Sequence, residues 1–146
     1  VKDISLALKN LGHSVDVISG EPYPMLEDGV NLIKLPGMNL FETFIFKDRL
    51  KKFIKSPKTF VNIYEFLSAL AGGFPEMYSF GKRANEFLKD NNNYDVVIDN
   101  QSLSYGMLEI QKRFPFIEII HPLPMFTLLP IINSGFGLVS NIKEFS

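Results

Sequence analysis

Apolar residues along this chain follow two patterns that alternate, the spacing of a helix face and the short apolar runs of strands. At residues 4–11 they stand three or four positions apart, which is the spacing of one face of a helix. Residues 15–19 follow as a short run rich in β-branched side chains, which is typical of a strand. The alternation predicts helices at 4–11, 44–55, 60–71, 79–90 and 103–114, and strands at 15–19, 30–35, 96–98 and 116–120, with a mobile loop as the alternative at 44–55.

Strands that alternate with helices predict an α/β fold with a doubly wound parallel sheet and helices on both of its faces. In such a sheet the carboxyl ends of the strands meet at one edge, and ligands bind there. Four segments would then line one crevice, each directly after a predicted strand: Gly20, Pro36-Gly37, Asp99 and His121.

The strongest local signal for function lies at the end of the strand at 96–98. Asp99, Asn100 and Gln101 follow that apolar strand directly. Carboxylate and amide groups accept and donate hydrogen bonds, so this triplet suits a hydroxyl-rich ligand. The alternative is that Asp99 or Asn100 caps the following helix, because both residue types are favoured N-caps.

Three further side chains are candidates for the same crevice. His121 follows an apolar strand and could donate to a ligand or take a proton, although a structural hydrogen bond is the alternative. Tyr23 lies in the proline-rich segment 20–24 and could stack on a sugar or lipid acceptor, unless the segment is only a connector. Glu76 ends the segment 72–76, whose glycines otherwise predict a helix C-cap and a turn.

Composition narrows the classes of function. The 146 residues fit one domain, and the net charge of −1 gives no general attraction to nucleic acid. The chain has no cysteine, which excludes disulfides and thiolate metal sites, and no metal-ligand cluster or phosphate-binding glycine loop occurs in it. Residues 116–139 are apolar but interrupted by prolines, so we interpret them as a buried strand and a loop rather than a membrane span.

Basic and apolar residues are interleaved at 44–55. This pattern suits a helix lying on an anionic membrane surface. A solvated basic face with an apolar stripe turned to the core explains the same pattern, and we favour that interpretation.

Five segments occur together in an informative order: 11–20 (LGHSVDVISG), 22–24 (PYP), 35–40 (LPGMNL), 73–76 (GFPE) and 95–101 (DVVIDNQ). Together they resemble the N-terminal, acceptor-side domain of retaining glycosyltransferases of family 4, also called group 1. The resemblance covers about residues 1–124. It implies a Rossmann-like domain that forms half of a GT-B architecture.

The resemblance also implies an activity and a division of labour. Such enzymes transfer a sugar from a nucleotide-sugar donor to a sugar or lipid acceptor, with retention and without a metal or another cofactor. By this resemblance His121 is the catalytic residue that contacts the donor sugar. The substrate-binding residues are Asp99, Asn100, Gln101, Tyr23 and Glu76.

On this basis we expect residues 1–146 to be a partial N-terminal domain. The first strand with its glycine-rich loop and the C-terminal donor-binding domain would lie outside it, and the piece alone would be inactive. We expect a cytoplasmic enzyme, with 44–55 as its candidate contact to the inner membrane face. A non-catalytic Rossmann-like binding module is the alternative; an epimerase or reductase domain is disfavoured because no dinucleotide glycine motif follows a strand.

Overall fold

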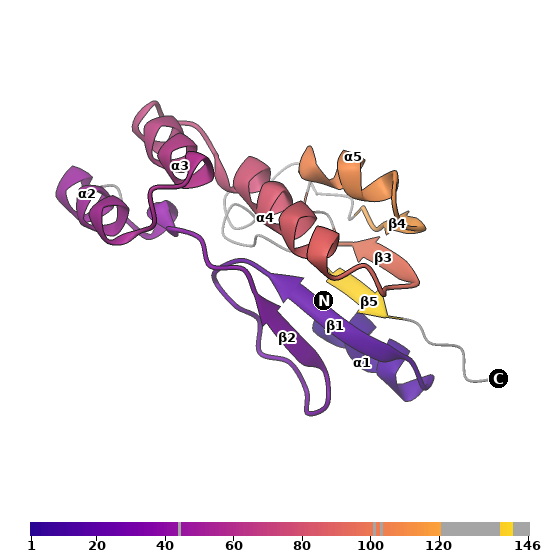
Figure 1. The fold of residues 1–146 in the computed structure, drawn as a ribbon. Coiled ribbons are helices and arrows are strands. Elements are labelled where there is room, and N and C mark those ends of the chain that lie inside the picture. The colour runs from indigo at the N-terminus through magenta and orange to yellow at the C-terminus, as the bar shows by residue number, and fades with distance from the viewer. Residues whose placement is uncertain (44, 101, 103, 121–137, 142–146) are drawn as a thin grey trace.

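The computed structural model describes residues 1–43, 45–100, 102, 104–120 and 138–141. These residues form a five-stranded sheet in the order β2-β1-β5-β3-β4 (Figure 1). The strands are β1 (Ser14–Ser19), β2 (Asn31–Lys34), β3 (Val96–Asp99), β4 (Phe116–Glu118) and β5 (Leu138–Asn141). The first four point the same way, since β2 is parallel to β1, β4 is parallel to β3, and β5 is antiparallel to both β1 and β3.

The antiparallel β5 corrects the expectation of a wholly parallel sheet. It lies between β1 and β3 and pairs Val139 with Asp16 on one side and with Val97 on the other. Its backbone groups thereby satisfy those of two buried strands, which would otherwise lack partners. The sequence pattern did not predict this strand, because its place in the sheet depends on pairing with two strands far away in the sequence.

Helices cover both faces of the sheet, as predicted. Helix α1 (Lys2–Asn10) lies against one face, while α4 (Glu76–Asp90) and α5 (Gly106–Gln111) lie against the other (Figure 1). Val17 and Ile18 are adjacent in β1 and both fully buried, Val17 in the cluster with α1 and Ile18 in the cluster with α4 and α5. A strand with two buried faces explains the continuous apolar run at this position.

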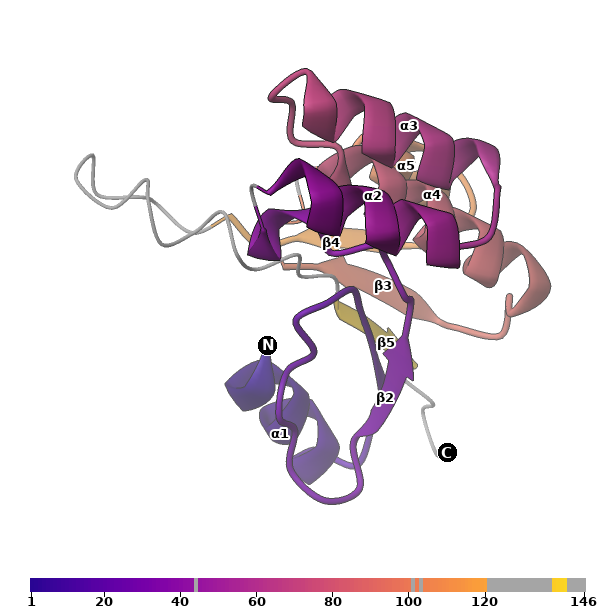
Figure 2. The same cartoon turned by 90° about the vertical axis from the view of Figure 1, so that its left-hand side faces the viewer.

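A second packing unit lies beyond the carboxyl ends of β1 and β2. It consists of the 3-10 turn η1 (Leu40–Glu42) and the helices α2 (Phe46–Lys55) and α3 (Phe60–Leu70), which run side by side in Figures 1 and 2. The rings of Phe53 and Phe66 stack between them with centroids 4.3 Å apart. The backbone N–H of Asn62 donates to the Thr59 hydroxyl over 3.2 Å, which caps the start of α3.

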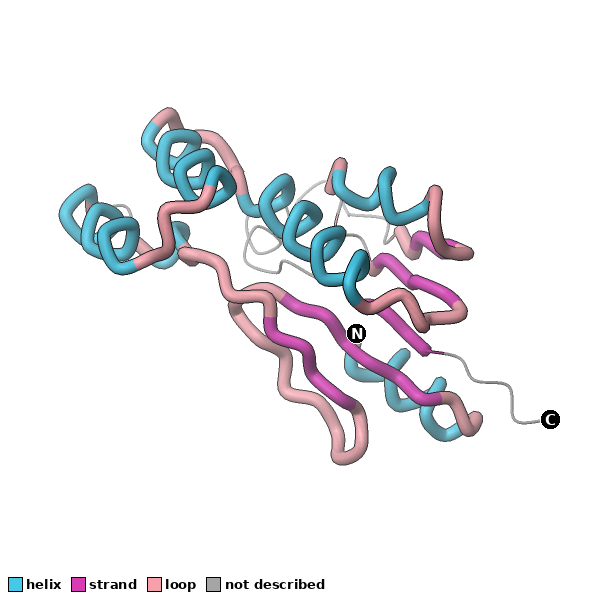
Figure 3. The backbone as a smooth tube through the Cα atoms, in the orientation of Figure 1, coloured by secondary structure: helices cyan, strands magenta, loops and turns pink. Residues whose placement is uncertain are grey.

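Most predicted elements occur within a few residues of their expected places. Figure 3 shows the observed helices, strands and loops on the backbone. Helix α4 begins earlier than expected, at Glu76, and α5 is much shorter than residues 103–114. The late start of α5 has a local cause, because the Asp99 carboxylate and the Ser104 hydroxyl accept from the backbone N–H groups of Ser102 and Gly106. Side chains that bond the backbone in this way favour turns over a helix.

Helices α4 and α5 touch at two glycines. A Cβ atom on Gly81 would lie 2.9 Å from Gly106 Cα, and one on Gly106 would overlap the Gly81 backbone. Such an approach is open only to residues without a side chain. The crossing of α4 and α5, and with it the position of the loop before α5, therefore depends on this glycine pair.

Candidate functional site

The carboxyl ends of four strands meet at one edge of the sheet. Ser19, Lys34, Asp99 and Glu118 end β1, β2, β3 and β4, and these strands are parallel to one another. The segments that contain Tyr23 and Asn100 leave from this edge. Two predicted site residues, Gln101 and His121, lie outside the described residues.

Asp99 is buried and its carboxylate closes the turn that follows β3. One oxygen accepts from the Ser102 backbone N–H over 3.0 Å, and the other accepts from the Ser102 hydroxyl over 2.9 Å. Burial raises the pKa of Asp99, the Ser102 bonds oppose that rise, and the nearby Glu118 adds to it. The residue before α5 is Tyr105, so Asp99 caps a turn and not the helix. Asn100 is also buried.

Tyr23 lies where β2 ends. The ammonium group of Lys34 is 5.0 Å from the centre of its ring, and its hydroxyl donates to a Glu21 oxygen over 3.3 Å. Burial and the negative charge of Glu21 raise the pKa of the Tyr23 hydroxyl, while Arg83 on α4 lowers it. Tyr23 therefore belongs to the rim of the strand-end edge, within the electrostatic reach of α4.

Glu76 is the first residue of α4, and one of its carboxylate oxygens is buried without a hydrogen-bond partner among the described residues. Burial is the main reason that the pKa of Glu76 rises to about 7, and the charge of Glu65 adds to it. Arg49 and Arg83 act in the opposite direction. This carboxyl group is thus poised to change its charge near neutral pH.

A buried polar network between α3 and α4 was not predicted from the sequence. Glu65 is 2% exposed, and its Oε1 atom accepts from Arg83 Nη1 over 2.8 Å and from the Ser79 hydroxyl. Arg83 Nη2 donates to Asn62 Oδ1, also over 2.8 Å. Asn62, Glu65 and Ala69 are all buried and stand three and four positions apart, so they share one helix face. That spacing is the signal that could have revealed a buried carboxylate.

Helix α2 turns part of its apolar stripe to the protein interior. Leu50 and Phe53 pack against the cluster of α3 and η1 residues. Lys52 donates to Glu42 over 2.9 Å and to the Asn39 carbonyl over 2.7 Å. These contacts support the core-facing interpretation of segment 44–55, and membrane contact stays a prediction. Within the described residues no helix is long and apolar enough to cross a membrane.

The raised pKa of Glu76 predicts a pH-dependent stability. A carboxyl group whose folded-state pKa is raised from 4.5 to about 7 stabilises the fold below pH 4.5, and that stability is lost as the pH rises through 7. We expect Glu76→Gln to match the wild type at pH 4 and to exceed it by about 1 kcal/mol at pH 8, after allowance for solvent screening. Urea unfolding at both pH values measures this difference.

The matched control is Glu86→Gln, which changes an exposed carboxylate on the same helix. Glu86→Gln should change the free energy of unfolding only slightly, and by the same amount at pH 4 and at pH 8. A Glu76→Gln variant that is less stable than the wild type at pH 8 would contradict the prediction.

The chain is similar in sequence to a known enzyme. A protein of Mycolicibacterium hassiacum named MMP alpha-(1->4)-mannosyltransferase is 38% identical over 127 residues, which is 83% of this chain and 30% of that protein. The chain thus spans about 30% of the length of this relative. No family model matches the chain, and no solved structure matches it. Over most of its length, this chain is homologous to one part of a glycosyltransferase.

Proposed function

We propose that this chain is the acceptor-side part of a glycosyltransferase that transfers a mannosyl group to a sugar acceptor. The similarity to an α-(1→4)-mannosyltransferase over 83% of the chain is the observation that carries this proposal. The parallel strand ends support it, because ligands of open α/β sheets bind at that edge. The non-catalytic alternative has no comparable observation in its favour.

The finer features of the proposal come from the family 4 resemblance. The donor is a nucleotide sugar, held mainly by a second Rossmann-like domain in a GT-B arrangement. Transfer proceeds with retention and needs neither a metal nor another cofactor. Among the described residues no group of three or more His, Cys, Asp or Glu side chains could hold a metal ion.

The geometry refines the roles of the substrate-binding candidates. Both Asp99 oxygens are engaged by Ser102, so Asp99 is proposed as a positioning residue that holds the turn carrying Asn100 and Gln101. Tyr23 would form the rim of the acceptor site, and Glu76 would contribute a carboxyl group of adjustable charge. His121 and Gln101 keep their proposed contacts with the donor sugar and the acceptor.

The proposal is tested with the full-length protein, nucleoside-diphosphate mannose donors and α-linked mannosides as acceptors. We expect mannosyl transfer by the full-length protein and none by residues 1–146 alone. Asp99→Asn keeps the side-chain shape but replaces one accepting oxygen by an NH2 group, so the Ser102 hydroxyl can no longer donate there and the turn is held differently. We expect kcat/KM for the acceptor to fall about tenfold. Initial rates over a range of acceptor concentrations measure it.

Asp95→Asn is the matched control, since this exposed aspartate directly precedes β3 and so lies at the end of the strand opposite to Asp99. It should leave kcat/KM within twofold of the wild type. Transfer that is absent with every donor would refute the proposed function, whereas an unaltered kcat/KM in Asp99→Asn would refute only the role of Asp99.

A further inference from the structure

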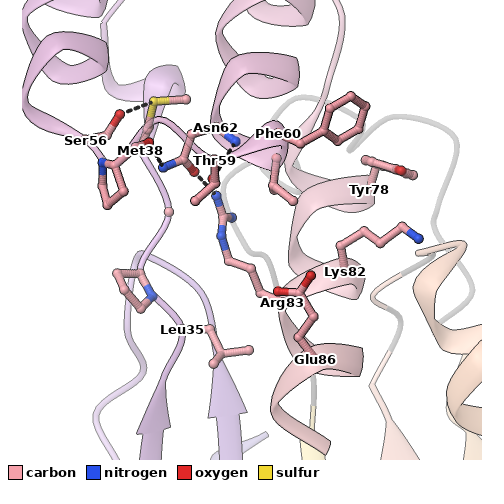
Figure 4. A pocket seen from close by; sticks show the side chains of 14 residues that line it. Leu35, Met38, Ser56, Thr59, Phe60, Asn62, Tyr78, Lys82, Arg83 and Glu86 are labelled. Atoms are coloured by element: carbon pink, nitrogen blue, oxygen red, sulfur yellow. Dashed lines mark hydrogen bonds between the residues drawn. The ribbon is translucent and has the colours of Figure 1, made fainter. Parts of the chain in front are cut away.

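A pocket of about 640 Å³ opens beside α4, where β2 gives way to the helical unit. Its walls come from three places that are far apart in the sequence: Leu35 to Met38 after β2, Ser56 to Asn62 at the start of α3, and one side of α4 (Figure 4). The volume is in the range of small-molecule sites. Pro36 and Gly37, which the sequence analysis placed at the crevice, line this pocket, whereas the described substrate-binding candidates Asp99, Asn100, Tyr23 and Glu76 do not.

Two planar polar side chains on the pocket wall are held in fixed orientations. Arg83 is 16% exposed and is bonded to Glu65 and to Asn62, which occupies two of its five N–H groups among the described residues. The Asn62 amide group donates to the Pro57 carbonyl over 2.9 Å. Both side chains therefore offer remaining donors or acceptors to a ligand without a large loss of side-chain entropy.

Two aromatic side chains also line the pocket. Phe60 is 76% exposed, so its ring is accessible to a ligand in the pocket. Tyr78 is held against Tyr64, with ring centroids 4.7 Å apart, and the Lys82 ammonium group lies 5.8 Å from the centre of the Tyr78 ring. An exposed ring next to ordered polar groups suits a ligand with both an apolar face and hydroxyl groups.

The charges around the pocket point to the same class of ligand. Lys82 and Arg83 are cationic and Glu86 is anionic, and all three belong to neighbouring turns of α4. A carboxylate on the wall disfavours a phosphate or another multiply charged anion. Mixed charges can instead each bond a neutral hydroxyl group, and pyranose rings present hydroxyl groups beside an apolar C–H face.

We propose that this pocket binds a sugar residue of an oligosaccharide acceptor, remote from the residue that receives the new sugar. The inference rests on the proposed transferase function and adds acceptor length as a determinant of specificity. The pocket begins at Leu35, directly after β2, and so adjoins the edge at which β3 ends with Asp99. An oligosaccharide acceptor whose reacting end lies at that edge of the sheet can extend from there into the pocket.

The test uses the full-length protein and two acceptors, methyl α-mannoside and an α-(1→4)-linked mannotetraose. Phe60→Ala and Tyr78→Ala should raise KM for the tetraose about tenfold and leave KM for the monosaccharide within twofold. Because the proposal assigns the rings a direct contact with the sugar, the variants Phe60→Tyr and Tyr78→Phe, which keep an aromatic ring, should have the KM values of the wild type. Leu67→Ala removes an exposed side chain of α3 that does not line the pocket, and should change neither KM.

A direct binding measurement separates this inference from the proposed function. Isothermal titration of the mannotetraose into the protein without donor should show binding in the wild type and at least a tenfold weaker Kd in Phe60→Ala. If the wild type transfers mannose but Phe60→Ala and Tyr78→Ala change KM equally for both acceptors, or for neither, the proposed role of the pocket is wrong and the proposed function still holds. If the wild type transfers no mannose, the proposed function is wrong, and the titration alone tests the pocket. In that case the absence of mannotetraose binding refutes the proposed role of the pocket.

Discussion

Replacing Gly106 by alanine is expected to lower the free energy of unfolding by about 3 kcal/mol. A Cβ atom at this position would overlap the backbone of Gly81, so α4 and α5 must move apart. Both helices contribute to the main core cluster, through Leu88 and Ile110 among others, and that cluster cannot loosen without cost. Urea unfolding of the variant and the wild type measures the difference.

This prediction is opposite in sign to that of helix propensity. In a helix that faces only solvent, glycine to alanine stabilises by about 1 kcal/mol. A Gly106→Ala variant that is as stable as the wild type, or more so, would therefore show that α4 and α5 do not cross as closely as described. Leu108→Ala is the control, because this side chain is 54% exposed on the same helix and should change stability little.

Much of the fold could be predicted because both periods in the sequence are clear. The helical spacing at 4–11 and the β-branched run at 15–19 are local signals, and α1 and β1 form within two residues of the expected places. The strand β5 could not be predicted in this way, since its place depends on pairing with two strands far away in the sequence. Local patterns report which face of an element is apolar and not which distant strand it joins.

The candidate site, like the fold, could be predicted only in part from local patterns. Its edge could be predicted because the direction of parallel strands follows from their connections, and Asp99 lies there. The hydrogen-bond partner of Asp99 could not be predicted, because Ser102 reaches the carboxylate through a turn whose shape depends on both residues. The pocket beside α4 needs the tertiary arrangement of α3 and α4, so Phe60 and Arg83 gave no functional signal in the sequence.

The network between α3 and α4 leads to the other large expected effect. Glu65 is almost fully buried, and its charge is balanced by Arg83. Arg83→Met keeps much of the side-chain volume but leaves the carboxylate without its cation. Removing one partner of a buried ion pair costs about 3–5 kcal/mol, so we expect a loss of that size in urea unfolding.

A double variant distinguishes the effect of the unpaired charge on stability from the effect of altered packing. Glu65→Leu combined with Arg83→Met removes both charges and should recover most of the loss, because an apolar pair of similar volume often stabilises as well as a buried ion pair. Lys82→Met, at the adjacent position of α4, is the control and should cost little. If the double variant is less stable than Arg83→Met alone, the carboxylate stabilises the fold mainly through Ser79, and Arg83 is not its necessary partner. If it recovers, the loss in Arg83→Met comes from the unpaired charge of Glu65, so Arg83, which also lies in the pocket wall, is the cation that balances this buried carboxylate.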